Sequence, residues 1–448
     1  MPVNETSHPN SKPAAGAVPG GETILTINGG SSSIKFALYS STHPPGRLLW
    51  GEIVRIGQAN SRLIAQSSTG ADPADIAAVV DEPINADTHQ RAAGELALWL
   101  RKHLDHLQGC SVAGVGHRVV HGGPRLLEHQ PVTAELLAEL RRTVPLDAAH
   151  LPREITLIET LTKEFSSALP VACFDTAFHR DLPLTAQMYP IPRRYFFRGV
   201  RRFGFHGLSF SYLRRELGRL AGAEAQGRVI LAHLGSGASM AALCGGKPMD
   251  TTMGFTPAAG LMMGTRPGDM DPGLVTYLMK CEGLAPEAME RWISGECGLL
   301  AVSETSSDMR DLLWRRGRDP RAAEAVALFC RQGRKWIGAL AAAMGGLDTL
   351  VFAGGIGEHA PEIREHICRG LEFMGIAIDP IRNVRGEPII SSPAGRVRVR
   401  VIPTDEQIMI AEAVLRILKP PARDDSNGSP TGAPIQPASI ATGERQSA

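Results

Sequence analysis

The stretches ILTINGGSSSIKFAL (residues 24–38) and VILAHLGSGASMAAL (residues 229–243) share one layout. Each runs from an apolar segment through a short loop of glycine and serine into a second apolar segment, which is the pattern of a β-hairpin. In this comparison Gly29 pairs with Gly235, and Ser33 pairs with Ser239. Because the pattern occurs twice, the sequence predicts two related domains that face each other, each presenting a tight Gly/Ser hairpin.

Both loops are suited to anions. A glycine has no Cβ, so backbone N–H groups and serine hydroxyls can approach a phosphate closely. One such hairpin is more simply an ordinary turn, but two of them fit a ligand that carries several phosphates. Neither loop ends in GK[ST], so neither is a Walker A loop, and the strand that follows each loop excludes a Rossmann fingerprint.

The composition limits the class of protein. A chain of 448 residues with 43% hydrophobic content can form two packed cores. Lys and Arg number 47 against 46 Asp and Glu, so no overall field favours nucleic acid or an acidic membrane. The seven cysteines are scattered, as in reduced cytosolic proteins, and are not spaced for zinc. With no signal peptide or membrane-length apolar run, we expect a soluble, cytoplasmic protein.

Strand-like and helix-like segments alternate between two tails. Residues 1–21 and 420–448 are rich in Pro, Ala, Ser and Gly, and we expect them to be disordered. Between them, apolar runs such as VAGVGHRVV and TLVFAGG alternate with stretches of helical period, the clearest of which spans residues 321–346 and ends at a glycine pair. This alternation predicts an α/β protein.

Four charged residues lie where a site is expected. Arg118 in GHRVVHGG ends an apolar strand between glycines, where it can clamp a phosphate or carboxylate or form an ordinary salt bridge. Arg266 lies in the long glycine-rich stretch GFTPAAGLMMGTRPGDMDP. Ordered loops of this length usually line a functional site. Asp175 follows the strand of CFDTAFH, where it can cap the next segment, serve a site, or do both. His206 lies between glycines, a better place for a donor than for a core histidine.

Two further stretches join a strand to a helix. GGIGE, residues 354–358, follows TLVFA, so its backbone donors and the helix dipole can meet an anion or a nucleoside edge. A plain strand-to-helix turn is the alternative. In VIPTDEQIMIAEAV, Thr404 is a candidate helix cap, and Glu406 in the first turn either binds a metal ion or complements the dipole.

Together these stretches resemble the acetate kinase family, within the superfamily of actin, Hsp70 and sugar kinases. The resemblance runs in order from Thr23 to Leu418, through INGGSSSIKF, GHRVVHGG, FDTAFH, RRFGFHG, MGFTPAAGLMMGTRPGDMDP, SSDMRDL, VFAGGIGE and IPTDEQIMIAE. It implies an α/β fold of two duplicated actin-like ATPase (ribonuclease H-like) domains around a central cleft. The first would comprise residues 22–175 and 407–419, and the second residues 176–406.

The resemblance also implies an activity. The protein would transfer the γ-phosphoryl group of ATP reversibly to a short-chain carboxylate, acetate or propionate, giving an acyl phosphate and ADP, with Mg²⁺ as cofactor. The likeness implies a homodimer, with no nucleic-acid or membrane partner expected. A carboxylate is already ionised near neutral pH, so catalysis needs positioning and charge neutralisation more than a strong base. Arginines, a histidine and metal-binding acids suit that task.

The family motifs imply a role for each matching position. The catalytic residues would be Arg118, Asp175, His206 and Arg266. The metal site would use Asn28 and Glu406. The acceptor's alkyl group would meet Val120, Leu146, Phe205 and Pro257. The residues that bind ATP would be Lys35, Ser31, Ser33, His233, Gly235, Ser236, Gly237, Asp308, Arg310, Gly354, Gly355 and Gly357.

The chain departs from the family pattern at the acceptor side. Acetate kinases read PLHNP where this chain reads PLDAAHLP, so Asp147 takes the place of the histidine and His150 follows three residues later. Either His150 assumes the histidine's role, or a carboxylate faces the acceptor. A carboxylate there would repel a plain anion and favour an acceptor with a cationic or hydroxyl group, or lower the activity. Ser236 and His359 replace asparagines near the nucleotide.

Two rival hypotheses remain at this point. One is a paralogue that binds nucleotide or acyl phosphate but turns over poorly, acting as a sensor. The other is a kinase of the same fold that uses pyrophosphate. The complete charge-neutralising set argues against the first, and GGIGE argues for adenosine and against the second. A kinase built this way is expected to close its domains over the phosphates.

Overall fold

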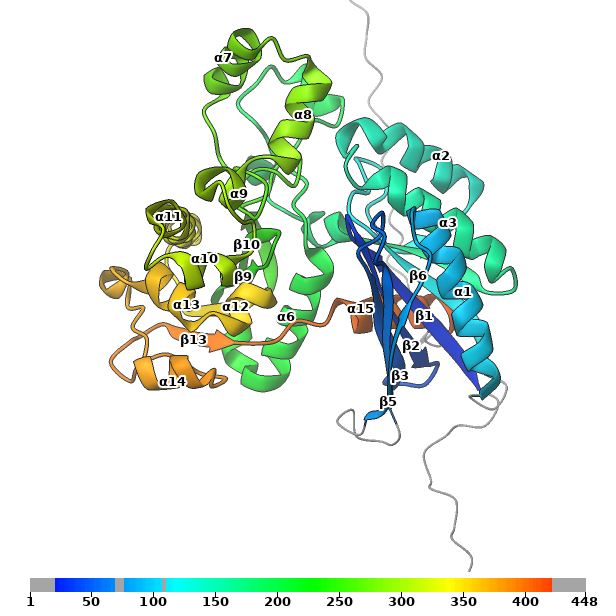
Figure 1. The fold of residues 1–448 in the computed structure, drawn as a ribbon. Helices are drawn as coiled ribbons and strands as arrows, with labels where there is room; N and C mark the ends of the chain where they lie inside the picture. Colours follow the sequence, from blue (N-terminus) through cyan, green and yellow to red (C-terminus); the bar gives the residue numbers. More distant parts are fainter. Residues whose placement is uncertain (1–20, 69–75, 107–109, 421–448) are drawn as a thin grey trace, which may run out of the picture.

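The computed structural model describes residues 21–68, 76–106 and 110–420. The predicted tails therefore lie almost wholly outside the described residues. Within the described residues the chain forms two β-sheets with helices on both sides, which confirms the α/β prediction (Figure 1). No helix in these ranges is both long and apolar enough to cross a membrane.

The first sheet has eight strands in the order β5-β4-β3-β2-β1-β6-β8-β7. Its strands are β1 (Glu22–Gly29), β2 (Ser33–Ser40), β3 (Arg47–Val54), β4 (Arg62–Ser68), β5 (Ile76–Pro83), β6 (Ser111–Val119), β7 (Gln130–Pro131) and β8 (Leu169–Phe174). Strand β1 pairs antiparallel with β2 and parallel with β6, and β6 pairs parallel with β8. Helices cover both faces at the centre, which explains the continuous apolar runs of β1 and β6.

The second sheet has the order β11-β10-β9-β12-β13. Its strands are β9 (Arg228–Leu234), β10 (Ala238–Cys244), β11 (Lys247–Thr251), β12 (Thr349–Ala353) and β13 (Arg398–Val401). Strand β9 pairs antiparallel with β10 and parallel with β12, and β12 pairs parallel with β13. This repeats the order and the directions of β3-β2-β1-β6-β8 in the first sheet. The fold is therefore duplicated, as the two hairpin sequences predict.

The two hairpins differ by one residue in the length of their turns. The last ladder pair of the first hairpin is Gly29 with Ile34, and that of the second is Leu234 with Ala238. Gly29 therefore corresponds to Leu234, one residue away from the predicted partner Gly235. The error arises because glycine and serine recur within both loops, so sequence identity alone favours a shifted pairing.

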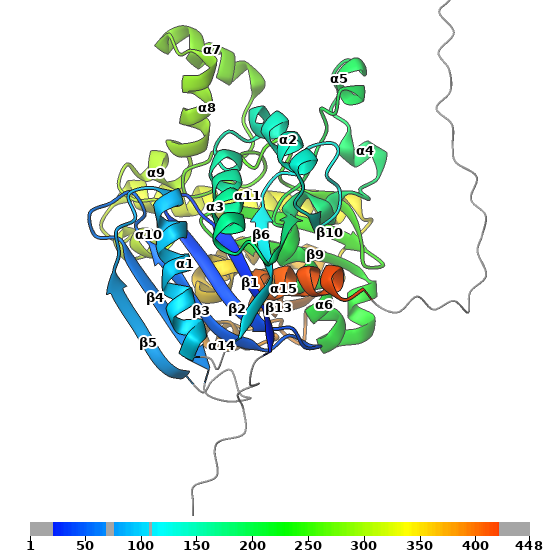
Figure 2. The ribbon, with the colours of Figure 1, turned by 90° about the vertical axis from the view of Figure 1, so that its right-hand side faces the viewer.

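Helices surround the two sheets. They are α1 (His89–His106), α2 (Ala134–Thr143), α3 (Leu151–Glu164), α4 (Leu184–Gln187), α5 (Arg194–Phe197), α6 (Gly207–Ala221), α7 (Pro272–Glu282), α8 (Pro286–Gly295), α9 (Gly298–Ser303), α10 (Met309–Arg315), α11 (Pro320–Ala343), α12 (Gly354–His359), α13 (Pro361–Cys368), α14 (Pro380–Arg385) and α15 (Glu406–Leu418). Single 3₁₀ turns occur at Val144–Leu146, Asp175–His179, Gly222–Gln226 and Glu372–Met374. Two pairs, α7 with α8 and α4 with α5, project from the body (Figure 2).

The helix predicted over residues 321–346 is confirmed as α11. It begins after Asp319, whose carboxylate accepts a hydrogen bond from the backbone N–H of Arg321, and it has a proline at its first position. It ends at Ala343, and Gly345 then adopts a positive φ of 71°. Glycine tolerates this left-handed conformation, which is why the pair stops the helix.

The last helix crosses back to the first sheet. The chain leaves β13 in the second half and enters α15, which packs against β1 and β6 of the first (Figure 1). A Cβ at Gly116 of β6 would lie 2.3 Å from Cγ2 of Ile410, and one at Gly114 would lie 2.6 Å from Cγ1 of Val414. These glycines let the helix approach the strand closely. The contact places the first residue of α15, Glu406, beside the carboxyl ends of β1 and β6.

Candidate active site

Four polar side chains meet at the carboxyl edge of the first sheet. Asn28 ends β1, Arg118 lies near the end of β6, Asp175 follows β8, and Glu406 begins α15. Parallel strands place their carboxyl ends at the same edge of a sheet, so three of these residues converge by topology alone. The fourth arrives with the returning helix.

Arg118 connects the members of this cluster. Its Nη2 and Nε donate to Oδ2 of Asp175 at 2.6 and 3.2 Å, and its Nη1 donates to Oδ1 of Asn28 at 3.0 Å. Asn28 Nδ2 donates to Oε2 of Glu406 at 2.8 Å. The guanidinium is thus held in one orientation before any ligand binds. Asp175 does not cap the 3₁₀ turn that follows β8, since the cap of that turn is Phe174 and it has no side-chain capping bond. The Asp175 carboxylate binds Arg118 and a backbone group of Leu208 near the start of α6.

Burial and opposite charges set the ionisation of the cluster. Burial alone would lower the pKa of Arg118, but Asp175 and Glu406 outweigh it and raise that pKa. Burial raises the pKa of Asp175 despite the stabilising charge of Arg118. For Glu406 the order is reversed: burial would raise its pKa, but Arg118 and His233 lower it below the ordinary value. Arg118 therefore stays cationic and Glu406 stays an anion at neutral pH.

A second cluster forms around the loop of residues 235–237. His206 Nδ1 shares a hydrogen bond of 2.8 Å with Ser239 Oγ on β10. A Cβ on Gly237 would lie 3.3 Å from both His206 Nε2 and Arg266 Nη2, so the loop, the histidine and the arginine converge. Burial, together with the neighbouring His233 and Arg118, holds the pKa of His206 well below its usual value. His206 is therefore neutral at physiological pH.

Close packing joins the two clusters. His206 adopts a left-handed φ of 58° at the start of α6, and Gly207 is the first residue of that helix. A Cβ on Gly207 would lie only 1.9 Å from the backbone oxygen of Asp175. The start of α6 thus rests directly on the backbone that carries Asp175, and only glycine fits between them.

A polar chain runs from His233 to the start of α15. His233 Nδ1 and Ser209 Oγ lie 2.8 Å apart, and Ser209 Oγ is 2.8 Å from Oγ1 of Thr404. The ring of His233 stacks on His206 with centroids 4.4 Å apart. The prediction that Thr404 caps α15 is wrong: Asp405 is the cap, and its carboxylate accepts from the N–H of Ile408 at 3.1 Å.

Arg266 is held by the long glycine-rich loop. Its Nη1 donates to the backbone oxygen of Pro257 at 2.7 Å, and its backbone oxygen accepts from Met263 at 2.9 Å. Residues 254–271 form no helix or strand, as their composition predicts. Burial lowers the pKa of Arg266, although the negative charge of Asp147 opposes that effect. An anion placed here would stabilise the charged guanidinium.

The predicted acceptor residues gather beside the arginines. Val120 and Phe205 are buried in one apolar cluster, and Leu146 packs against it. Pro257 is also buried and holds Arg266 through its carbonyl group.

The polar side of the predicted acceptor region holds the predicted pair Asp147 and His150 and one residue, His121, that was not predicted from the sequence. Asp147 is buried, and its Oδ1 lies 2.7 Å from Nδ1 of His150. The residue that sequence reasoning missed is His121, whose ring lies 4.5 Å from Phe203 and 5.3 Å from Phe205. The sequence feature that could have identified His121 is its place in VVHGG, directly after Val120.

The GGIGE turn, which forms the first part of the short helix α12, lies against the end of β9. Gly354 has a positive φ of 76°, and a Cβ there would be 2.8 Å from the backbone oxygen of Leu234, the residue before the second loop. Glu358, also missed from the sequence, accepts from the N–H of Gly354 at 2.8 Å and of Thr404 at 3.1 Å. It therefore ties this turn to the segment that enters α15.

Most of the other residues predicted to bind ATP lie in or near the two loops. Lys35 is opposite Asn28 in the β1–β2 ladder, and its charge helps to lower the pKa of Glu406. Asp308 caps α10, and its carboxylate pairs with the exposed guanidinium of Arg310 at 2.6 Å. Both side chains are thus bound to each other at the start of this helix. The other predicted members are divided among three places: the two loops hold Ser31, Gly235 and Ser236, strand β2 begins with Ser33, and helix α12 contains Gly355 and Gly357.

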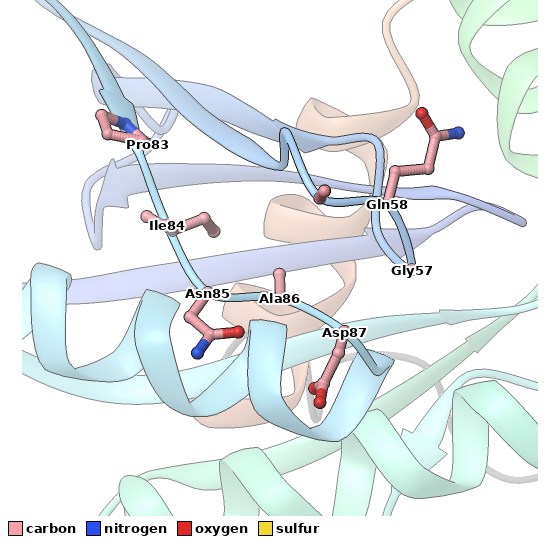
Figure 3. Close-up of a pocket in the computed structure, with 8 residues that line it drawn as sticks. Gly57, Gln58, Pro83, Ile84, Asn85, Ala86 and Asp87 are labelled. Carbon is pink, nitrogen blue, oxygen red and sulfur yellow. The ribbon is translucent and has the colours of Figure 1, made fainter.

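Two surface hollows border the first sheet. One, of about 510 Å³, lies between β2, β3 and β4 of this sheet, Tyr212 of α6 and the segment that enters α15, and its lining includes Lys35 and Thr404, so it adjoins the charged cluster. The other, of about 450 Å³, lies between the turn at residues 57–59 and the segment 83–87 before α1 (Figure 3). It contains none of the predicted site residues, and its lining carries one charged group, Asp87.

Comparison with known proteins gives a consistent result. The model of the Acetokinase family matches residues 23–412. The chain is 42% identical over 400 residues to an acetate kinase of Nitrobacter hamburgensis, covering 89% of this chain and 96% of the relative. It is 41% identical over 400 residues to a propionate kinase of Citrobacter rodentium, covering 88% and 96%. The crystal structure of Porphyromonas gingivalis acetate kinase is similar, with a TM-score of 0.76 and 36% identity, covering 89% of this chain and all of that one.

Proposed function

The chain belongs to the acetokinase family, and we propose on that basis that it phosphorylates a short-chain carboxylate with ATP. An oxygen of the carboxylate forms a bond to the γ-phosphorus, the bond from that phosphorus to the β–γ bridging oxygen breaks, and ADP leaves with the electron pair. The products are an acyl phosphate and ADP, and the reverse reaction makes ATP. The observation that carries the proposal is the convergence of Arg118 and Arg266, one from each half of the molecule, on one polar site.

The arginines and the histidine neutralise the transferring charge. Arg118 is fixed by Asp175 and Asn28, so it reaches the acceptor and the equatorial phosphoryl oxygens without reorganising. Arg266 and His206 approach the same group from beside the second loop. Because His206 is neutral, it donates a hydrogen bond without adding a full charge. The carboxylate needs no proton removed, so none of these residues acts as a strong base.

Glu406 and Asn28 fit a magnesium site. Mg²⁺ is commonly held by one or two carboxylates together with substrate phosphates, and Glu406 is kept ionised by its neighbours. Among the described residues no three His, Cys, Asp or Glu side chains form a preformed metal cage, so the phosphates would supply the other ligands. The ion would neutralise charge on the β- and γ-phosphates.

The two hairpins and the glycine turn are proposed to bind ATP. The phosphates would lie between Lys35 with Ser31 and Ser33 on one side and Gly235 to Gly237 with His233 on the other. The adenosine would lie on Gly354, Gly355 and Gly357, with Asp308 and Arg310 as the opposite wall. Support comes from the contact between this turn and the end of β9, which leads straight into the second loop.

We propose the domain division that the resemblance implies, with residues 22–175 and 407–419 in the first unit and 176–406 in the second. Each unit then contains one complete sheet, and α15 returns to the first. The charged groups come from both units, so we also propose that the units close over the bound phosphates. Equal compactness by X-ray scattering with and without MgATP and acceptor would contradict closure.

A homodimer is proposed from the projecting arms. Phe197 at the end of α5 is 76% exposed and Tyr277 of α7 is 61% exposed, and large apolar side chains on projecting helices (Figure 2) are suited to contact with a second chain. Sedimentation should give the mass of two chains, and Phe197→Asp should shift it toward one. Dependence on ATP and the scattered cysteines favour the cytoplasm as the compartment.

A hydroxamate assay tests the activity. Purified protein is incubated with MgATP and acetate, propionate or butyrate, and hydroxylamine traps any acyl phosphate. We expect turnover of at least one of these acids or of a substituted relative, lost in Arg118→Ala. ATP binding without any acyl phosphate across the panel would contradict the proposal and favour a nucleotide sensor.

A further inference from the structure

The carboxylate of Asp147 has one oxygen without a partner. The side chain is 2% exposed, and Oδ1 bonds to Nδ1 of His150 at 2.7 Å. Oδ2 is buried, and within residues 21–68, 76–106 and 110–420 it has no hydrogen-bond partner. Buried polar atoms nearly always have partners, because an unpaired one loses its hydration without compensation. An orphaned carboxylate oxygen is therefore a place where a ligand's donor is expected.

The position of Asp147 puts that oxygen at the acceptor pocket. The preceding residue, Leu146, packs against the apolar cluster of Val120 and Phe205. Burial lowers the pKa of both Arg266 and His121, and the negative charge of Asp147 opposes that shift in each, so the carboxylate lies near the guanidinium of Arg266 and the imidazole of His121. Burial raises the pKa of Glu154, and the negative charge of Asp147 raises it further. Asp147 is thus buried among the polar groups that border the predicted acceptor pocket.

His150 holds the carboxylate in this orientation. With Nδ1 on Oδ1, the ring fixes the plane of the Asp147 carboxylate and leaves Oδ2 as its free acceptor. The imidazole itself is 25% exposed at the start of α3, so it supports Asp147 from the outer side. His150 is therefore a positioning residue, and Asp147 is the residue that meets the acceptor.

We propose that the preferred acceptor is a small carboxylate whose carbon chain carries a hydrogen-bond donor, a hydroxyl or an ammonium group, bound by Oδ2 of Asp147. The inference rests on the proposed kinase activity and names its substrate class. An unsubstituted acid would be unfavourable for two reasons. First, Oδ2 would stay without a hydrogen-bond donor. Second, the carboxylate of Asp147 would lie near the carboxylate of the acid, which carries the same charge. A donor removes the first penalty, and an ammonium group also offsets the second.

Three acceptors of the same size separate the possibilities. Propionate, glycolate and glycine differ in one group, which is methyl, hydroxyl or ammonium. The assay measures kcat/KM for each by ADP release, with hydroxamate as the check on acyl phosphate. We expect glycolate or glycine to exceed propionate at least tenfold, because a site built around a hydrogen bond rejects an isostere that lacks it. The better of the two identifies the donor.

Variants at Asp147 test its part in the preference. Asp147→Leu keeps a similar shape without an acceptor and should reverse the preference toward propionate, by at least tenfold in the ratio. Asp147→Asn is the second variant if leucine disturbs the fold, and it should abolish the advantage of glycine. Asp81→Asn is the control, since Asp81 lies on the outer strand β5 and pairs with Arg62. It should leave the ratio unchanged.

Each outcome bears on one claim. If wild type prefers propionate, or if the ratio is the same in Asp147→Leu, the inference is overturned while the kinase activity stands. If neither wild type nor Asp147→His, which restores the residue seen in acetate kinases, phosphorylates any of the acids, the proposed function itself fails.

Discussion

The fit of Gly207 between the two clusters yields a sharp prediction. In Gly207→Ala the new Cβ would lie 1.9 Å from the backbone oxygen of Asp175 and 2.7 Å from Cβ of Phe178, whereas ordinary contact begins at 3.4 Å. The gap is short by 3.4 − 1.9 = 1.5 Å, and both neighbours are rigid. Either the start of α6 moves, carrying His206, or the backbone of Asp175 moves, carrying the partner of Arg118.

Either movement separates groups that must act together. A misplacement of about 1 Å costs roughly a hundredfold in rate, which is about 2.7 kcal/mol of transition-state stabilisation. We therefore expect kcat/KM in the hydroxamate assay to fall by about that factor, with circular dichroism still native. The matched control is Gly218→Ala on the same helix, where no atom lies within 4 Å. It should keep full activity and raise stability by up to about 1 kcal/mol.

The reasoning would be refuted by a folded Gly207→Ala enzyme with activity within threefold of wild type. That result would mean that the junction of α6 with Asp175 does not position the reacting groups. Loss of activity in Gly218→Ala as well would show that α6 is sensitive throughout, and the steric argument would lose its basis.

Three further predictions follow from charge. Asp175→Asn should lower kcat/KM ten- to a hundredfold, since it removes a charged hydrogen-bond partner worth about 1.5–3 kcal/mol from Arg118; unchanged kinetics would oppose this. Excess EDTA should stop turnover, and Glu406→Gln should raise the Mg²⁺ concentration for half-maximal rate about tenfold, unlike Glu412→Gln on the same helix. Stability should fall below pH 6.5, because buried histidines with a lowered pKa stay neutral in the folded chain but take up protons when unfolded. Burial lowers the pKa to about 3 for His117 and to about 4 for His121, His129 and His179. Each of these four histidines contributes about 1.4 kcal/mol for each pH unit below its ordinary pKa of about 6.5. Between pH 7.5 and 5.5 about one such unit is crossed, so the unfolding free energy measured in urea titrations should drop by roughly 5 kcal/mol; a flat profile would contradict the prediction.

Local sequence patterns predict much of the architecture. The duplicated hairpin was visible because each copy needs apolar strands around a loop free of bulky side chains. The central residues Arg118 and Asp175 were found because each stands at the end of an apolar strand, where parallel topology brings such positions together. The long helix α11 was clear from its period and its terminal glycines.

Other features depend on partners distant in sequence. Thr404 and Asp405 are both able to cap a helix, and the choice is made by Ser209, which takes the threonine hydroxyl. Glu358 joins two segments 46 residues apart, which no spacing rule reveals. The direct bond between Asp147 and His150 agrees with their spacing of three, but the orphaned Oδ2 depends on how the pocket is packed around it.

The measurement that tests the central claim most directly follows an oxygen atom. The enzyme is given MgATP and the best acceptor from the panel, labelled with ¹⁸O in its carboxylate, and hydroxylamine is added to cleave the product at the acyl carbon. Transfer to the carboxylate predicts that each phosphate released carries one ¹⁸O from the acid. Phosphate without label, its new oxygen coming from water, would show hydrolysis of ATP instead and would contradict the account.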